Sequence, residues 1–162
     1  SAANQLTQVF PQLSFAVASV IAPKLSSLKD KKTAISYLKK TQLLVFLIAF
    51  GAIILLPGAI FLIPLVLGSI YHESIGPFVI LFFAQLIFFL SIPVHQSIFY
   101  YFAKPKFFVF ISLLNLILMF ILAIYLIPEY RVTGAAVVIL FGNIFNLLVP
   151  TVWVVYNFRK SK

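Results

Sequence analysis

The chain has 162 residues, of which 63% are hydrophobic and only 9% are charged, and its mean hydropathy is +1.14. So few polar residues cannot cover a soluble globule, and the composition therefore predicts a membrane protein. The absence of cysteine excludes disulfides, thiolate metal sites and thiol nucleophiles in this sequence. The net charge of +9 raises the alternative of nucleic-acid binding, but the basic clusters lie beside apolar segments, so we expect no nucleic-acid partner.

Five segments have the length and apolar character of membrane-spanning helices. A helix needs about 20 mostly apolar residues to cross a hydrocarbon core of about 30 Å, and it satisfies its own backbone hydrogen bonds there. The first segment is weaker than the other four, because it mixes glutamines and serines with its apolar residues. The predicted spans are residues 5–23, 43–70, 77–103, 107–127 and 132–158. Because the connections are short, we predict an all-α fold, a polytopic membrane helix bundle with one domain over residues 1–162.

The connection after the first span, KLSSLKDKKTAISYLKK, is predicted to form a helix along the membrane interface. Apolar residues recur in it at near-helical spacing and lysines fill other positions, as in helices that lie on a bilayer. The apolar residues are Leu25, Leu28, Ile35 and Leu38. Asp30 is placed to cap this helix by accepting a hydrogen bond from a backbone N–H two or three residues later.

The second span, residues 43–70, is longer than one perpendicular crossing requires. At about 1.5 Å per residue it would extend roughly 42 Å, so tilt or a kink must absorb the excess. Pro57 and Pro64 supply places for a kink, and Pro93 and Pro150 do the same in the third and fifth spans. Whether any of these prolines is a functional hinge or an ordinary membrane-helix proline stays open.

Lysines and arginines alternate between successive connections. Eleven of the twelve lie in the first connection, the third connection and the C-terminal tail, against only Arg131 in the fourth connection and none in the second. Under the positive-inside rule, the basic segments face the cytoplasm. We therefore predict a multi-pass protein of the cytoplasmic (inner) membrane, with cytoplasmic basic loops and C-terminus and with anionic headgroups of the bilayer near its lysines.

The sequence contains few groups for catalysis or for metal binding. Its three acids, Asp30, Glu73 and Glu129, fall in three different connections, so no two carboxylates share a segment in which they could act as acid and base. Along a helix, His72 and His95 would be roughly 35 Å apart. We expect no enzymatic activity, no catalytic residue, no metal site and no cofactor.

Neutral polar residues occur inside the predicted spans, where lipid offers them no hydrogen-bond partner and where they should face the bundle interior. The candidate cavity-lining residues are Gln5, Gln8, Gln12, Gln85, His95, Gln96, Asn115, Asn143 and Asn146. Two roles are open for them: hydrogen bonds between helices, each contributing about 0.6 kcal/mol, or contact with a substrate. His95 is singled out because it alone in this set can change charge near neutral pH.

The stretch IPEYRVTGAA, residues 127–136, predicts a hairpin between the last two spans. Pro128 is expected to end the fourth helix, and the three residues after it suit the water interface. Gly134 and the two alanines after it have side chains small enough for close approach of two backbones.

This hairpin resembles the turn before the last helix of a lobe in polysaccharide flippases, members of the multidrug/oligosaccharidyl-lipid/polysaccharide exporter superfamily. Three other segments resemble motifs of the family in the same order along the chain. They are IAPKLSSL at 21–28, YHESIGPFVILFFAQ at 71–85 and FAKPKF at 102–107. Arg131 departs from the pattern, because the family usually has glycine at that position.

The resemblance implies that the chain corresponds to the last five helices of the second six-helix lobe of a larger transporter, whose N-terminal lobe would be its partner. It also implies a lipid-linked glycan substrate, an oligosaccharide or polysaccharide precursor flipped across the membrane by alternating access. Two alternatives stay open: a multidrug or cation antiporter of the same superfamily, and a non-transporting membrane scaffold subunit. The lack of acids within the spans favours the sugar-lipid substrate over a cation.

Overall fold

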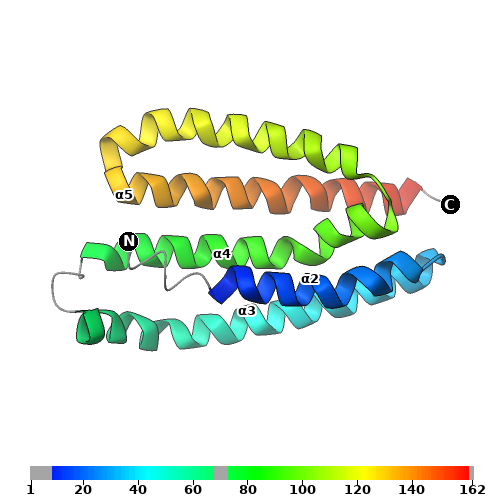
Figure 1. The fold of residues 1–162 in the computed structure, drawn as a ribbon, viewed down its shortest axis with the longest axis horizontal. Coiled ribbons are helices and arrows are strands. Elements are labelled where there is room, and N and C mark those ends of the chain that lie inside the picture. Colours follow the sequence, from blue (N-terminus) through cyan, green and yellow to red (C-terminus); the bar gives the residue numbers. More distant parts are fainter. Residues whose placement is uncertain (1–8, 68–72, 161–162) are drawn as a thin grey trace.

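The computed structural model describes residues 9–67 and 73–160, and over these residues the chain is a bundle of helices without a β-strand. The helices pack side by side with their long axes roughly aligned (Figure 1). In chain order they are α2 (Val9–Ser27), α3 (Lys31–Leu67), α4 (Ile75–Gln96), the short π-helical segment η2 (Ser97–Tyr101) and α5 (Pro105–Lys160). Three helical stretches of the described chain are long and apolar enough to cross a membrane: Lys31–Leu62, Ile75–Tyr101 and Pro105–Lys160. The predicted all-α membrane helix bundle is confirmed. The predicted first span, residues 5–23, falls largely on α2, which is not among these three stretches.

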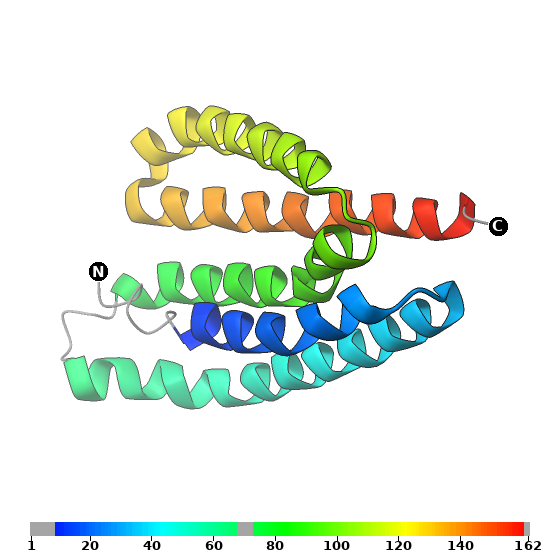
Figure 2. The same ribbon diagram turned by 45° about the vertical axis from the view of Figure 1, so that its right-hand side comes forward.

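The long helix α5 consists of two antiparallel helices joined at Arg131. This residue has φ 49° and ψ −120°, close to the first central position of a type II′ turn, which glycine dominates. The chain reverses there, so residues 105–130 and 132–160 lie side by side (Figures 1 and 2). We call them the first arm and the second arm of α5. They correspond to the predicted fourth and fifth spans.

The helix of the first arm does not end at Pro128, as the sequence had suggested. It continues to Tyr130, and the only non-helical residue within α5 is Arg131. A proline removes one backbone donor and crowds the preceding turn, yet membrane helices tolerate it. The reversal comes instead from the positive φ of Arg131.

The lysine-rich connection after α2 is not a separate helix but the beginning of α3. From Lys31 to Phe50 the sequence contains no glycine or proline to end a helix, so helical hydrogen bonding runs straight into the apolar part. The cap predicted for its start is confirmed. Asp30 Oδ2 accepts hydrogen bonds from the backbone N–H of Thr33 at 2.8 Å and from the Thr33 hydroxyl at 2.7 Å.

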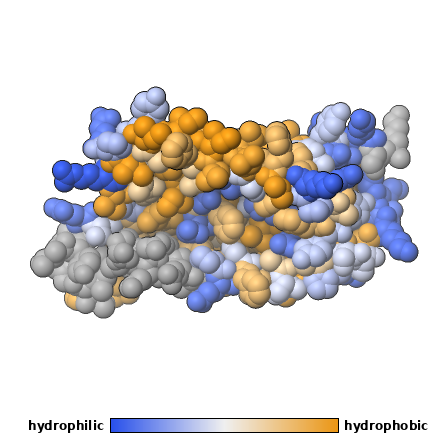
Figure 3. Space-filling view, turned by 45° about the horizontal axis from the view of Figure 1, so that its top comes forward, coloured by the Kyte–Doolittle hydropathy of each residue, from blue (hydrophilic) through white to orange (hydrophobic). Residues whose placement is uncertain are grey.

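α4 lies at the centre of the bundle and contacts α2, α3 and α5. Its aromatic and aliphatic side chains form the core with residues of α2 and α3, and Phe82 meets Phe10 edge to face at 5.2 Å between ring centroids. By contrast, α3 and the first arm of α5 turn many large apolar side chains outward. On the face seen in Figure 3, hydrophobic residues gather over the upper middle, and hydrophilic residues lie toward both ends and across the lower part. This pattern suits contact with lipid.

The basic segments gather at one end of the bundle. The turn between α2 and α3, the connection between η2 and α5, and the end of the second arm lie at the same end in Figures 1 and 2. We call it the basic end. The end of α3, the start of α4 and the turn at Arg131 lie at the other end. The fold therefore agrees with the predicted alternation of charge, while the side that faces the cytoplasm stays a prediction.

Candidate functional site

Seven of the nine candidate polar residues lie in the described part of the chain, and they are not gathered around one cavity. Gln5 and Gln8 lie outside the described residues. Gln12 is exposed on α2, whereas Gln85 and Gln96 are half-buried on α4. The remaining four are buried or half-buried along α4 and the two arms of α5: His95, Asn115, Asn143 and Asn146.

His95 joins α4 to the second arm of α5 through a carbonyl that a proline leaves without its helical donor. Because Pro150 has no N–H, it cannot donate the usual helical hydrogen bond to the carbonyl oxygen of Asn146, four residues earlier. The Nε2 of His95 lies 2.8 Å from that oxygen. A carbonyl can only accept, so Nε2 carries the hydrogen of this bond.

The other side of the His95 ring is enclosed by a hydroxyl and by aromatic rings. Its Nδ1 lies 3.4 Å from the Oγ of Ser91, whose hydroxyl donates to the carbonyl of Phe88 at 2.6 Å. The ring of Phe108 packs on the imidazole at 4.9 Å between centroids. The side chain is only 5% exposed, so it is held inside the bundle.

Two amide side chains form comparable links to carbonyls of α4. Asn143 Nδ2, on the second arm, donates to the Ala84 carbonyl at 2.8 Å. Gln42 Nε2, on α3, donates to the Leu90 carbonyl at 3.0 Å. For His95 and Asn143 the contacts are thus those of the first role left open by the sequence, hydrogen bonding between helices. Gln42 was missed, since it lies between the lysine-rich stretch and the predicted second span.

Asn115 is a buried residue of the first arm whose amide is only partly satisfied. Its Nδ2 lies 3.7 Å from the Met119 sulfur, and its Oδ1 has no hydrogen-bond partner among the described residues. The side chain is 8% exposed. Burial of an unpaired amide oxygen costs free energy.

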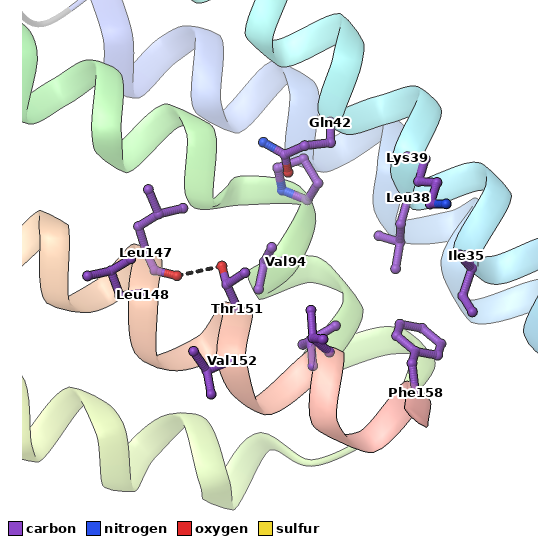
Figure 4. Close-up of a pocket in the computed structure, with 13 residues that line it drawn as sticks. Ile35, Leu38, Lys39, Gln42, Val94, Leu147, Leu148, Thr151, Val152 and Phe158 are labelled. Carbon is purple, nitrogen blue, oxygen red and sulfur yellow. Dashed lines mark hydrogen bonds between the residues drawn. The ribbon is translucent and has the colours of Figure 1, made fainter. Parts of the chain in front are cut away.

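A cleft of about 460 Å³ opens between α3, α4 and the second arm of α5 (Figure 4). It lies toward the basic end, because α3 contributes its N-terminal part and the second arm its C-terminal part. The residues that form its walls include Ile35, Leu38, Lys39 and Gln42 of α3, Val94 of α4, and Leu147, Leu148, Thr151, Val152 and Phe158 of the second arm. None of the seven described candidate residues lines it.

The lining leaves one charged group for a ligand. The amide nitrogen of Gln42 is engaged by the Leu90 carbonyl, and the Thr151 hydroxyl donates to the Leu147 carbonyl at 2.5 Å, as the dashed line in Figure 4 marks. Lys39 is exposed at the edge, and the other wall residues are apolar. The volume is that of a ligand pocket, about 300–1,000 Å³. Such a cleft can hold an apolar chain whose end carries negative charge.

Acidic residues take no part in this cleft, and the chain's three acids are all exposed. Among residues 9–67 and 73–160, no three His, Asp or Glu side chains come together in a group that could hold a metal ion. Comparison of the chain with protein-family models, with curated proteins and with solved structures finds no match.

Proposed function

We propose that this chain is part of a membrane transporter that flips a lipid-linked oligosaccharide or polysaccharide precursor, and that the cleft beside Lys39 holds part of the substrate's lipid. The observation that carries the proposal is the cleft itself, which has apolar walls from three helices and one cation, Lys39, at its edge. A lipid-linked glycan joins a long apolar chain to sugar through phosphate. The apolar walls suit the chain, and the Lys39 ammonium suits the phosphate.

The chemistry of the lining favours this substrate over a drug cation or a coupling ion. Transport of cations within a membrane commonly uses a buried carboxylate, whereas the acids of this chain are exposed and lie outside the cleft. Lys39 would repel a cationic drug at the same place. We therefore place the antiporter second.

A non-transporting scaffold subunit is the other candidate, and one observation favours it. His95, Asn143 and Gln42 hydrogen-bond to the main chain of neighbouring helices, which is what a purely structural bundle requires. The cleft is the feature that such a scaffold leaves without a purpose.

The test is to block the cleft in the full-length protein that contains this chain, expressed in a flippase-deficient host with a matching glycan. Val152 lines the cleft and is 68% exposed, so Val152→Trp can fill the opening without entering the core. Val109 on the first arm is 67% exposed and does not line the cleft, which makes Val109→Trp the matched control. We expect Val152→Trp to abolish restoration of surface polysaccharide and Val109→Trp to preserve it, at equal protein abundance.

Equal restoration by both variants would show that the cleft does not carry the substrate. Drug efflux without movement of glycan, by the unaltered full-length protein, would favour the antiporter. If the protein moves neither and its loss instead disturbs the assembly of other membrane proteins, the scaffold is the better description.

A further inference from the structure

A second pocket, of about 400 Å³, lies between the end of α2 and the first turns of α3. It occupies a face of α3 largely opposite to the cleft. Tyr37 and Lys40 line the pocket, whereas Ile35 and Gln42, each two positions away, line the cleft, and two residues turn about 200° around a helix. We call it the lysine pocket. The residues that line it are Lys24, Leu28, Lys32, Thr33, Ser36, Tyr37 and Lys40. The sequence predicts anionic headgroups near the lysines in general, but neither the sequence nor the proposed function assigns a ligand to this pocket.

Three cations from two helices meet at the lysine pocket. Lys32 and Lys40 lie two helical turns apart on one face of α3, with the Ser36 hydroxyl between them, and Lys24 comes from the last turn of α2. No acidic residue is among the described residues that line the pocket. An anion held between these lysines would offset their mutual repulsion, and the hydroxyl can donate a hydrogen bond to it.

The acid nearest in sequence does not fill this role. Asp30 precedes α3, and its Oδ2 is already bound by the backbone N–H and the hydroxyl of Thr33. These two bonds, with a smaller contribution from the charge of Lys32, hold the pKa of the Asp30 carboxyl below its usual value of 3.8. The carboxylate therefore caps α3, and Asp30 is not among the residues that line the lysine pocket.

The surface beyond the pocket indicates which anion fits. Leu43, Leu44 and Leu47 follow Lys40 by three, four and seven residues, so they continue the same face of α3 toward the middle of the bundle. They are 60%, 54% and 58% exposed. A ligand whose phosphate occupies the pocket can thus lay an apolar chain along these three leucines. A soluble phosphate compound would leave them unused.

We propose that the lysine pocket binds the phosphate headgroup of an anionic phospholipid, whose acyl chain lies along Leu43, Leu44 and Leu47. Basic pockets between membrane helices bind such headgroups by charge and hydrogen bonding. The lipid bridges the end of α2 and the start of α3, which are otherwise joined by a short turn. This proposal does not rest on the proposed function, because the lysine pocket and the cleft share no lining residue.

The test compares lipid binding by two double variants with the same change in net charge. Lys32→Gln with Lys40→Gln removes two cations of the pocket, and Lys104→Gln with Lys106→Gln removes two from the same end of the bundle but outside the pocket. Binding of phosphatidylglycerol and of phosphatidylcholine to the purified protein is measured by native mass spectrometry. We expect the first double variant to bind phosphatidylglycerol about 25-fold more weakly, at roughly fivefold for each lysine near an anionic headgroup.

The control variant should bind phosphatidylglycerol as the unaltered chain does, and phosphatidylcholine should bind weakly to all three. Equal weakening in both double variants would overturn the proposal, since binding would then follow net charge. If glycerol phosphate at millimolar concentration displaces phosphatidylglycerol and binds as tightly as the lipid does, the lipid assignment is overturned and the ligand is a soluble phosphate compound. Fluorescence of Trp153, which stacks on Phe107 at 4.2 Å, confirms that each variant is folded before binding is compared.

Discussion

The two arms of α5 meet backbone to backbone at Gly134, and Gly134→Ala should separate them. A Cβ at this position would lie 2.1 Å from the carbonyl oxygen and 2.7 Å from the carbonyl carbon of Leu126. These atoms belong to the main chain of the first arm, so no change of rotamer relieves the overlap. The arms must move apart by roughly 1 Å or more to restore ordinary contact distances of about 3.5 Å. We expect a loss of about 3 kcal/mol, the upper part of the range for overpacked sites.

Gly142→Ala is the matched control, because it makes the same substitution on the same arm. A Cβ there would lie 2.6 Å from the sulfur of Met119 and 2.9 Å from its Cγ. The methionine side chain is flexible and can move away, so we expect a loss below about 1 kcal/mol. Gly58→Ala on α3, where nothing lies within 4 Å of the added atom, should be neutral or stabilising by up to about 1 kcal/mol.

The chain carries its own probe for this experiment. Trp153 is the only tryptophan, and it stacks on Phe107 from the opposite arm with ring centroids 4.2 Å apart. Its fluorescence should change when the arms separate during unfolding in sodium dodecyl sulfate. If Gly134→Ala unfolds at the same denaturant fraction as Gly142→Ala, the arms do not pack through Gly134 and the described hairpin is incorrect.

Three further predictions use the same unfolding assay. Arg131→Gly should stabilise the hairpin by about 1 kcal/mol, because glycine adopts positive φ without a steric penalty, and Arg131→Ala should not. His95→Leu should lower the free energy of unfolding by about 1–3 kcal/mol, because it leaves the Asn146 carbonyl unpaired. In a Pro150→Ala background this loss should be smaller, since the new backbone N–H supplies a donor. An unchanged loss would refute the pairing of His95 with this carbonyl. The pKa of Asp30 is lowered in the folded chain, so its cap stabilises the fold above the unfolded pKa, and this stability is lost as pH falls through the lower folded value. Below about pH 3.8, the stability of the unaltered chain should therefore depend more strongly on pH than that of Asp30→Ala.

The helical content and the membrane character could be predicted because both follow from local composition. The hairpin followed from small residues and a break in hydrophobicity, and the cap at Asp30 from one side chain near one helix start. The prediction of an interfacial helix distinct from the second span was wrong. The lysines of residues 31–40 make this part of α3 more polar, but they do not interrupt its backbone hydrogen bonds. The predicted helix end at Pro128 was wrong, because the chain reverses at Arg131. The conformational preferences of arginine do not predict a positive φ there.

The cleft and the polar links could not be predicted because they join residues far apart in the chain. Ile35, Val94 and Leu147 form one cleft only after three helices have packed. Likewise, the sequence could identify His95 as a polar residue in a span, but not that Pro150 would leave a carbonyl for it. Side-chain donors inside membrane helices are visible in a sequence, whereas the acceptors that they find depend on packing.

The hydrogen bond from His95 to the Asn146 carbonyl also restricts how the bundle can deform. If α4 slid along the second arm, that oxygen would face hydrocarbon without a donor, and hydrocarbon cannot solvate it. Asn143 and the Ala84 carbonyl form a second such bond further along the same two helices. α4 and the second arm of α5 should therefore move together as one rigid unit. Bending would be confined to joints beside it, such as the π-helical turn Ser97–Tyr101, where the helical hydrogen-bond pattern is already altered.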